Sequence, residues 1–140
     1  MGLPRGIRNN NPGNLRRTDI NWQGEGDANG PNLPDDVAFE TFTTPQHGVR
    51  AMMRCLQTYE RKYGPQTIET LIDRWAPPVE NDTGAYVSHV ARYCGVSKDA
   101  IFSTRNKAEM IQLCKAITLH ENGQNPYPDS VFERAWELLG

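Results

Sequence analysis

The chain has 140 residues, of which 37% are hydrophobic, and its formal net charge is −2 at pH 7. A chain of this length is the size of one ordinary domain and can bury roughly two-thirds of its unfolded surface. The slight negative charge and the mean hydropathy of −0.68 argue against a general attraction to nucleic acid or to acidic membranes.

The first 45 residues are rich in glycine, asparagine and proline, and hold two short apolar runs, around residues 14–22 and 37–42. This composition predicts loops with one or two small hairpins. The segment has no apolar core of the signal-peptide kind, and the chain has no uninterrupted apolar run of 18 residues. We therefore expect synthesis in the cytoplasm without a signal peptide, no membrane insertion, and delivery by other machinery to any target in the cell wall or periplasm.

After Pro45 the apolar residues recur at helical spacing. A first helix carries apolar residues from Val49 to Tyr63. It ends at Gly64-Pro65, because glycine and proline are signals for the end of a helix. A shorter helix covers residues 68–75 and stops at the prolines of "WAPP".

Three further helices are predicted in the rest of the chain. Asp82 or Thr83 can cap a helix whose inner face runs from Tyr86 to Cys94, with Gly95 just past its end. "SKDAIF" has the pattern of a single turn, a helix follows over residues 106–121, and the last helix begins at residue 129 or 130. We predict an α+β, predominantly α fold in one domain over residues 1–140, with a small irregular β-containing lobe (1–45) and a helical lobe (46–140).

The helix over residues 106–121 ends in an unexpected residue. Met110, Leu113 and Ile117 form an apolar stripe, and the next position on that stripe is Glu121. Partial burial and the negative end of the helix dipole both favour the protonated form of a carboxyl group there. A protonated carboxylic acid is what a glycosidase needs to protonate the leaving oxygen of a sugar bond. The alternative is a helix-terminal glutamate that turns to solvent or accepts a bond from a nearby backbone N–H.

Four segments occur in a suggestive order: "RNNNPGNLRR", "NWQG", "FETFTTPQHGVRAMMRCLQTY" and "WAPPVENDTGAYVSHV". The series resembles bacterial cell-wall glucosaminidases of the flagellar and autolysin type. In that family the catalytic Glu ends a helix that precedes the asparagine-rich strand, whereas no acidic residue precedes Asn11 here. The segment "AITLHENG" is similar to the family's helix-ending "ALLESG" segment. The resemblance thus implies a circularly permuted domain with Glu121 as the acid, which is feasible because chain ends often lie close together.

Nearly the whole chain also resembles small phage and prophage proteins that carry "RGIRNNNPGN", "WAPPxEND" and "HENG"-type segments. That resemblance implies a lysozyme-like, peptidoglycan-cleaving protein, either an endolysin or a virion protein. The resemblance implies that the protein's partner is the glycan strand of peptidoglycan. The reaction would be that of a muramidase, a glucosaminidase or a lytic transglycosylase, with Glu121 as general acid/base. We expect it to act as a monomer. The alternatives are a non-enzymatic virion or wall-binding module, and an exported antibacterial toxin with an immunity protein.

Hydrolysis would be helped by a second carboxylate that activates water, about 6.5–9.5 Å from the acid in an inverting enzyme or about 5–5.5 Å in a retaining one. Our candidates are Glu80 and Glu40. Asp82 is more simply explained as a helix cap. A lytic transglycosylase needs no such residue, because a hydroxyl of the sugar itself attacks the anomeric carbon.

Substrate binding is assigned to Asn11, Asn14, Trp22 and Tyr86. The asparagines can hydrogen-bond acetamido groups and hydroxyls, and Trp22 can stack on a sugar face. The resemblance places Tyr86 in the substrate cleft. Each also has a structural interpretation, because asparagines suit tight turns and both aromatic residues can belong to the core.

No cofactor is expected. The three histidines, His47, His89 and His120, are far apart and form no metal-binding motif, and no nucleotide-binding glycine motif is present. The three cysteines lie within apolar helical patterns and are expected to be reduced.

Overall fold

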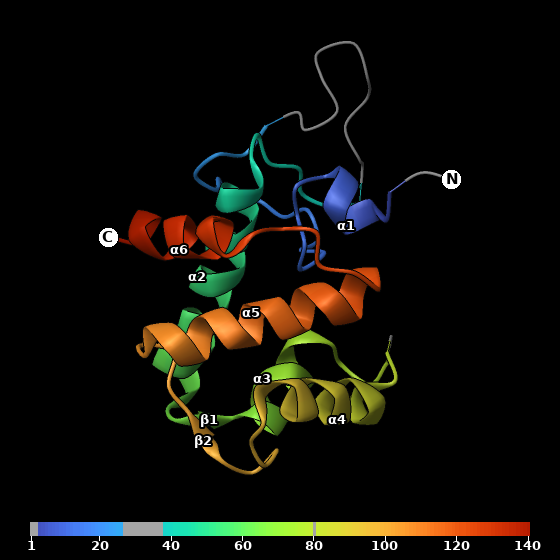
Figure 1. Cartoon of the computed structure of the whole chain (residues 1–140), viewed down its shortest axis with the longest axis vertical. Helices are drawn as coiled ribbons and strands as arrows, with labels where there is room; N and C mark the ends of the chain where they lie inside the picture. Colours follow the sequence, from blue (N-terminus) through green and yellow to red (C-terminus); the bar gives the residue numbers. More distant parts are fainter. Residues whose placement is uncertain (1–2, 27–37, 80) are drawn as a thin grey trace.

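The computed structural model describes residues 3–26, 38–79 and 81–140 (Figure 1). In chain order its elements are α1 (Arg5–Arg8), α2 (Pro45–Tyr63), β1 (Gln66–Thr67), α3 (Ile68–Trp75), α4 (Thr83–Cys94), β2 (Ile101–Phe102), α5 (Lys107–Asn122) and α6 (Asp129–Leu138). The fold class predicted above, α+β and predominantly α, is confirmed.

Side-chain caps and glycines mark the ends of α2, α4 and α5. The hydroxyl of Thr44 accepts a hydrogen bond from the backbone N–H of His47 at the start of α2. The carboxylate of Asp82 accepts a hydrogen bond from the backbone N–H of Ala85 at the start of α4. Gly95 and Gly123 close α4 and α5 in the left-handed region, with φ of 69° and 70°. Only glycine adopts that conformation without strain.

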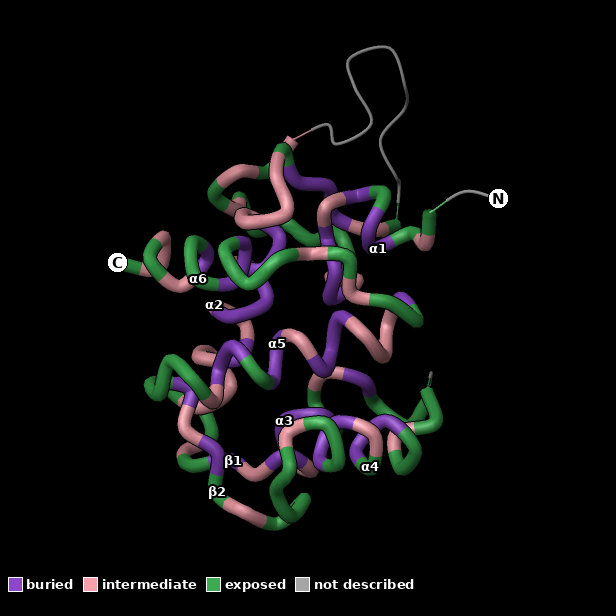
Figure 2. Tube along the Cα trace, in the orientation of Figure 1, coloured by how far each residue is buried: buried purple, intermediate pink, exposed green. Residues whose placement is uncertain are grey.

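Helix α5 lies at the centre of the molecule, with α6 on one side and α4 on the other (Figure 1). It also contacts α1 and α2. Its residues Met110, Leu113 and Ile117 are completely buried, which confirms the predicted apolar stripe. Figure 2 shows buried stretches along α5. Glu121, one turn further on, is half-buried. The chain thus uses its central helix to carry a carboxyl group to the edge of the core.

The two-stranded sheet lies outside the N-terminal lobe. β1 and β2 pair antiparallel, with Gln66 opposite Phe102 and Thr67 opposite Ile101, so this sheet belongs to the helical part of the chain. The segment "SKDAIF", expected to be a single turn, contributes β2. Among the described residues of the N-terminal lobe, β pairing is limited to two isolated bridges, Arg16 with Phe39 and Glu25 with Phe42.

Side-chain amides take the place of regular strands in that lobe. The amide of Asn11 donates to the carbonyl oxygens of Leu15 and Glu40, both at 2.9 Å, and its oxygen accepts from the N–H of Leu15. Asn10 donates to the carbonyl of Phe42 at 3.0 Å. Because these amides satisfy buried backbone groups, they hold residues 3–26 and 38–44 together with little sheet.

The lobe approaches the start of α2 very closely. A Cβ atom on Gly48 would lie 1.8 Å from the carbonyl oxygen of Asn10, so only glycine fits there. Asn10 itself has a φ of 53°, a left-handed conformation that asparagine tolerates. This contact fixes the lobe on the helical part of the chain.

The three cysteines are thiols on α2, α4 and α5, as predicted. Burial raises the pKa of Cys55 and of Cys94 to about 11, so both are protonated near neutral pH. Within the described ranges, no helix combines the length and the apolar character needed to span a membrane.

Candidate active site

Glu121 is held by residues from two other parts of the chain. Its Oε1 accepts a hydrogen bond from Nδ2 of Asn14, and its Oε2 accepts one from the hydroxyl of Tyr86, both at 2.8 Å. The end of α5 therefore lies against the asparagine-rich segment, with α4 supplying Tyr86. Three parts of the chain that are far apart in the sequence thus meet at this carboxyl group.

The residue after Glu121 fastens α5 to the same segment. Nδ2 of Asn122 donates to the carbonyl oxygen of Pro12 and to that of Thr118, both at 2.9 Å. On the other side, a Cβ on Gly6 would lie 2.5 Å from Oδ1 of Asn122, so α1 packs directly on this helix end. The position of Glu121 is set by these buried contacts.

Tyr86 is only 2% exposed and belongs to the core as well as to the site. Burial raises its pKa well above the ordinary value, and the charge of Glu121 and the hydrogen bond to it act in the same direction. A hydrogen bond with the indole of Trp75 opposes the increase. Because an indole N–H can only donate, the Tyr86 hydroxyl accepts from Trp75, and it donates a hydrogen bond to Glu121.

A cleft of about 470 Å³ opens above Glu121. Four of its lining residues are aromatic, namely Trp22, Phe39, Tyr59 and Trp75. The other residues that line it include Asn14, Leu15, Arg16, Thr18, Ile20, Pro77, Asn81 and Glu121. Aromatic faces beside amides and a carboxyl group are suited to a carbohydrate, which presents apolar C–H faces and polar edges. Trp22 and Asn14, which the sequence analysis assigned to substrate binding, both line this cleft.

Trp75, Tyr59 and Asn81 are cleft residues that the sequence did not single out. Trp75 belongs to the "WAPP" segment that carried the resemblance to phage proteins, and this was the available signal. A Cβ on Gly13 would lie 2.6 Å from the indole of Trp75, so the bare backbone of Gly13 makes room for the ring.

A smaller hollow of about 380 Å³ adjoins the other side of Glu121. It is lined by Asn81, Asp82, Ala85, Tyr86, His120 and Glu121. The ring of His120 stacks on Tyr86 with 3.8 Å between centroids, and its Nδ1 lies 2.8 Å from Nδ1 of His89. Burial lowers the pKa of His120, the proximity of His89 lowers it further, and Glu121 opposes both. Since one Nδ1 must donate and the other accept, this contact requires at least one neutral ring.

The candidates for a second carboxylate are distributed differently from expectation. Glu40 is 1% exposed and lines neither hollow, and its Oε1 accepts from the N–H of Thr18 at 3.3 Å. Burial raises its pKa, as do a hydrogen bond and charge repulsion from Glu25, whose Oε2 accepts from the N–H of Trp22. Glu40 and Glu25 therefore support the loop that forms one wall of the cleft. Glu80 lies outside the described residues.

Asp82 caps α4, and it also lines the smaller hollow with Glu121. Asn11 is fully buried, and its amide is bonded to backbone groups, so the structure places it beneath the cleft wall and not among the lining residues. In the described ranges, no group of three or more His, Cys, Asp or Glu residues is arranged to hold a metal ion.

No family model matches the chain. Over 136 residues it is 39% identical to protein P5 of Pseudoalteromonas phage PM2, an alignment that covers 95% of this chain and 80% of that protein. The chain belongs to the family of phage PM2 protein P5. Membership in the P5 family confirms the bacteriophage association that the sequence predicted.

Proposed function

We propose that this P5-family protein cleaves the glycan strand of bacterial peptidoglycan, with Glu121 as general acid/base. The observation that supports this most directly is the carboxyl group of Glu121, held between an amide and a hydroxyl at the floor of an aromatic-lined cleft. Positioned carboxyl groups of this kind are the general acids of glycoside cleavage.

The two hydrogen bonds suit the step in which a glycosidic bond breaks. Protonated Glu121 gives its proton to the leaving oxygen and becomes a carboxylate. Asn14 and Tyr86 then donate to a charged acceptor, and hydrogen bonds to charged groups contribute about 1.5–3 kcal/mol each, more than neutral ones. The site therefore stabilises the charge that forms on Glu121 as the bond breaks.

The second step has two possible forms. In a hydrolase, a base activates water, and Asp82 is the carboxylate that lines the same hollow as Glu121. In a lytic transglycosylase, a sugar hydroxyl attacks the anomeric carbon and Glu121, now a base, takes its proton. Mass spectrometry of the released fragments distinguishes them, because hydrolysis leaves reducing ends and transglycosylation leaves anhydro ends.

A permuted, lysozyme-like glucosaminidase domain is supported by the contact between Asn14 and Glu121. These residues are 107 positions apart, yet they join the asparagine-rich segment to a helix-ending glutamate. In the glucosaminidases that the sequence resembles, the same two features are consecutive in the chain. The phage relative favours a role in crossing the host cell wall over that of an exported toxin.

The decisive experiment compares the wild type with Glu121→Gln on purified peptidoglycan. We expect clearing by the wild type and a loss of at least about a hundredfold in the variant, the scale for losing a general acid. The variant should remain folded, because the glutamine amide has the shape of the carboxyl group and its oxygen keeps one of the two acceptor positions, and a thermal melt checks this. Glu109→Gln, at the other end of α5, is the matched control and should retain full activity.

Equal clearing by the wild type and Glu121→Gln would remove Glu121 from the mechanism. Binding to peptidoglycan without clearing by either protein would support the second candidate function, a wall-binding module of the virion.

A further inference from the structure

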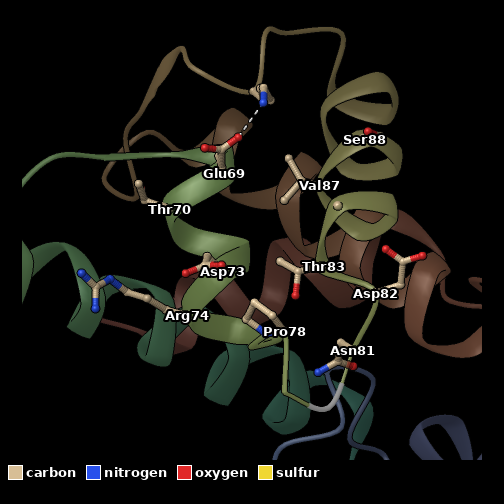
Figure 3. A pocket seen from close by; sticks show the side chains of 12 residues that line it. Glu69, Thr70, Asp73, Arg74, Pro78, Asn81, Asp82, Thr83, Val87 and Ser88 are labelled. Carbon is tan, nitrogen blue, oxygen red and sulfur yellow. Dashed lines mark ion pairs between the residues drawn. The ribbon is translucent and has the colours of Figure 1, made fainter.

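A third hollow, of about 840 Å³, lies between α3 and α4 (Figure 3). Glu69, Thr70, Asp73 and Arg74 line it from α3, and Val87 and Ser88 line it from α4 (Figure 3). Lys98 also lines it and forms an ion pair with Glu69 at 2.8 Å. The catalytic step proposed above uses none of these residues.

This groove adjoins both of the hollows that Glu121 lines. Asp82 and Asn81 line the groove and the smaller hollow, and Asn81 also lines the aromatic cleft. Nδ2 of Asn81 donates to the carbonyl of Pro77 at 3.2 Å, which positions this residue at the junction. The surface around Glu121 therefore branches, and a branched surface suits a polymer that branches.

The groove is lined by charges of both signs. Carboxylates come from Glu69, Asp73 and Asp82, and cationic groups come from Arg74 and Lys98. Glu69 is paired with Lys98, and the guanidinium of Arg74 lies 3.5 Å from the centroid of the Tyr63 ring. Within the described ranges no ion pair or hydrogen bond engages the Asp73 side chain, which leaves an available carboxylate along the groove. Such a lining suits a ligand with both ammonium and carboxylate groups.

The length of the groove also limits the ligand. Helix α3 has eight residues, which corresponds to roughly 12 Å at about 1.5 Å per residue. An extended peptide advances about 3.3–3.6 Å per residue, so the groove can hold about three or four residues. Short peptides of mixed charge are attached at regular intervals along the glycan strand of peptidoglycan.

We infer that the groove between α3 and α4 binds the peptide stem of peptidoglycan while the glycan occupies the cleft at Glu121. This inference rests on the proposed function. An ammonium group of a diamino acid in the stem pairs with Asp73, and stem carboxylates lie towards Lys98 and Arg74. The protein consequently cleaves peptide-bearing glycan better than bare glycan.

The test uses two substrates: intact peptidoglycan, and the same material after an amidase has removed its stem peptides. Two variants alter the groove, Asp73→Lys by reversing a charge and Ser88→Trp by filling space at an exposed position. Each should lose about tenfold in kcat/KM on intact peptidoglycan and stay within about twofold of the wild type on stripped glycan. Glu137→Lys, an exposed carboxylate on α6, is the control and should match the wild type on both substrates.

A second measurement does not depend on cleavage. The released stem peptide is titrated into the wild type and into Asp73→Lys, and amide chemical shifts are followed by NMR. We expect shifts at groove residues in the wild type and a dissociation constant at least about fivefold weaker in Asp73→Lys.

Equal losses on the two substrates, or no loss on either, would overturn the stem-binding inference and leave the proposed cleavage intact. If the wild type cleaves neither substrate, the proposed cleavage fails. The peptide titration then decides alone, since weaker binding by Asp73→Lys supports a stem-binding groove and unchanged or absent binding overturns it.

Discussion

The helical part of the molecule and its N-terminal lobe are held together by different forces. Around α5 the chain buries a continuous apolar core that includes Leu113 and Ile117. The lobe of residues 3–26 and 38–44 relies on side-chain amides, above all Asn11, which bond buried backbone groups. Glu121 lies where the two regions meet, so a polar framework positions one side of the site and an apolar core positions the other.

The difference between the two regions is tested most strongly by truncating one central side chain in each. Leu113→Ala should lower the free energy of unfolding by about 2–5 kcal/mol, the range for a buried leucine. Asn11→Ala should cost at least about 2 kcal/mol, because it leaves the N–H of Leu15 and two carbonyls without their partner, at about 1–3 kcal/mol for each unpaired buried group. Urea denaturation measures both, with the exposed Gln112→Ala as control.

A loss below about 0.5 kcal/mol for Asn11→Ala, the level of an ordinary surface substitution, would contradict the idea of a polar framework.

The next effect concerns the hydroxyl of Tyr86. Tyr86→Phe removes a donor to Glu121 and an acceptor for Trp75, and we expect activity on peptidoglycan to fall by about tenfold to a hundredfold. The matched control is Tyr127→Phe, because the buried hydroxyl of Tyr127 has no hydrogen-bond partner within the described ranges. That control should leave activity unchanged and stability equal or higher. Equal activities for the two variants would show that the Tyr86 hydroxyl serves packing alone.

Asn14 contributes both an amide and an unusual backbone conformation, with a φ of 52°. Asn14→Gly keeps the left-handed backbone and removes only the amide, so we expect about a tenfold loss of activity with little change in stability. Asn14→Ala removes the same amide and adds about 1–2 kcal/mol of backbone strain, which thermal unfolding should detect. Identical melting temperatures for the two variants would show that an alanine at position 14 causes no backbone strain.

The smallest expected effect is a pH dependence of stability that comes from His120. Its pKa is lowered in the folded protein by burial and by His89, so the unfolded chain binds a proton more readily. The free energy of unfolding should therefore decrease as the pH falls below the ordinary histidine pKa of 6.5, until His120 titrates in the folded state too. His120→Gln should show a shallower decrease in urea titrations between pH 5 and pH 7.5. Parallel curves for the two proteins would contradict this assignment.

The regular part of the fold was predictable because it follows the hydrophobic pattern. The stripe of Met110, Leu113 and Ile117 identified α5, and its continuation identified Glu121 as the residue out of place. The pairing of β1 with β2 was missed because two-residue strands are too short to produce an alternating pattern. Their register depends on tertiary contacts.

The site was predictable in part for a related reason. Asn14 and Trp22 line the cleft and Tyr86 lines the smaller hollow beside Glu121, yet the same asparagine-rich run also supplies Asn11, whose amide is used inside the lobe. The sequence alone does not show which of two asparagines three positions apart bonds to the backbone and which one lines a cleft. Glu40 was misplaced for the same reason, since the position of its carboxyl group depends on Glu25 and on the loop that both support.

The bond between Asn14 and Glu121 also has a consequence for the order of folding. It closes a loop of 107 positions. The loss of chain entropy on closing a flexible loop of that size costs roughly 4 kcal/mol of free energy or more. During synthesis, the cleft cannot form until α5 has emerged and docked on a lobe made long before it. The helices can gain structure from local contacts, whereas the site depends on contacts of high sequence separation and should be completed late. A chain interrupted before α5 would therefore carry most of the wall of the cleft and no acid.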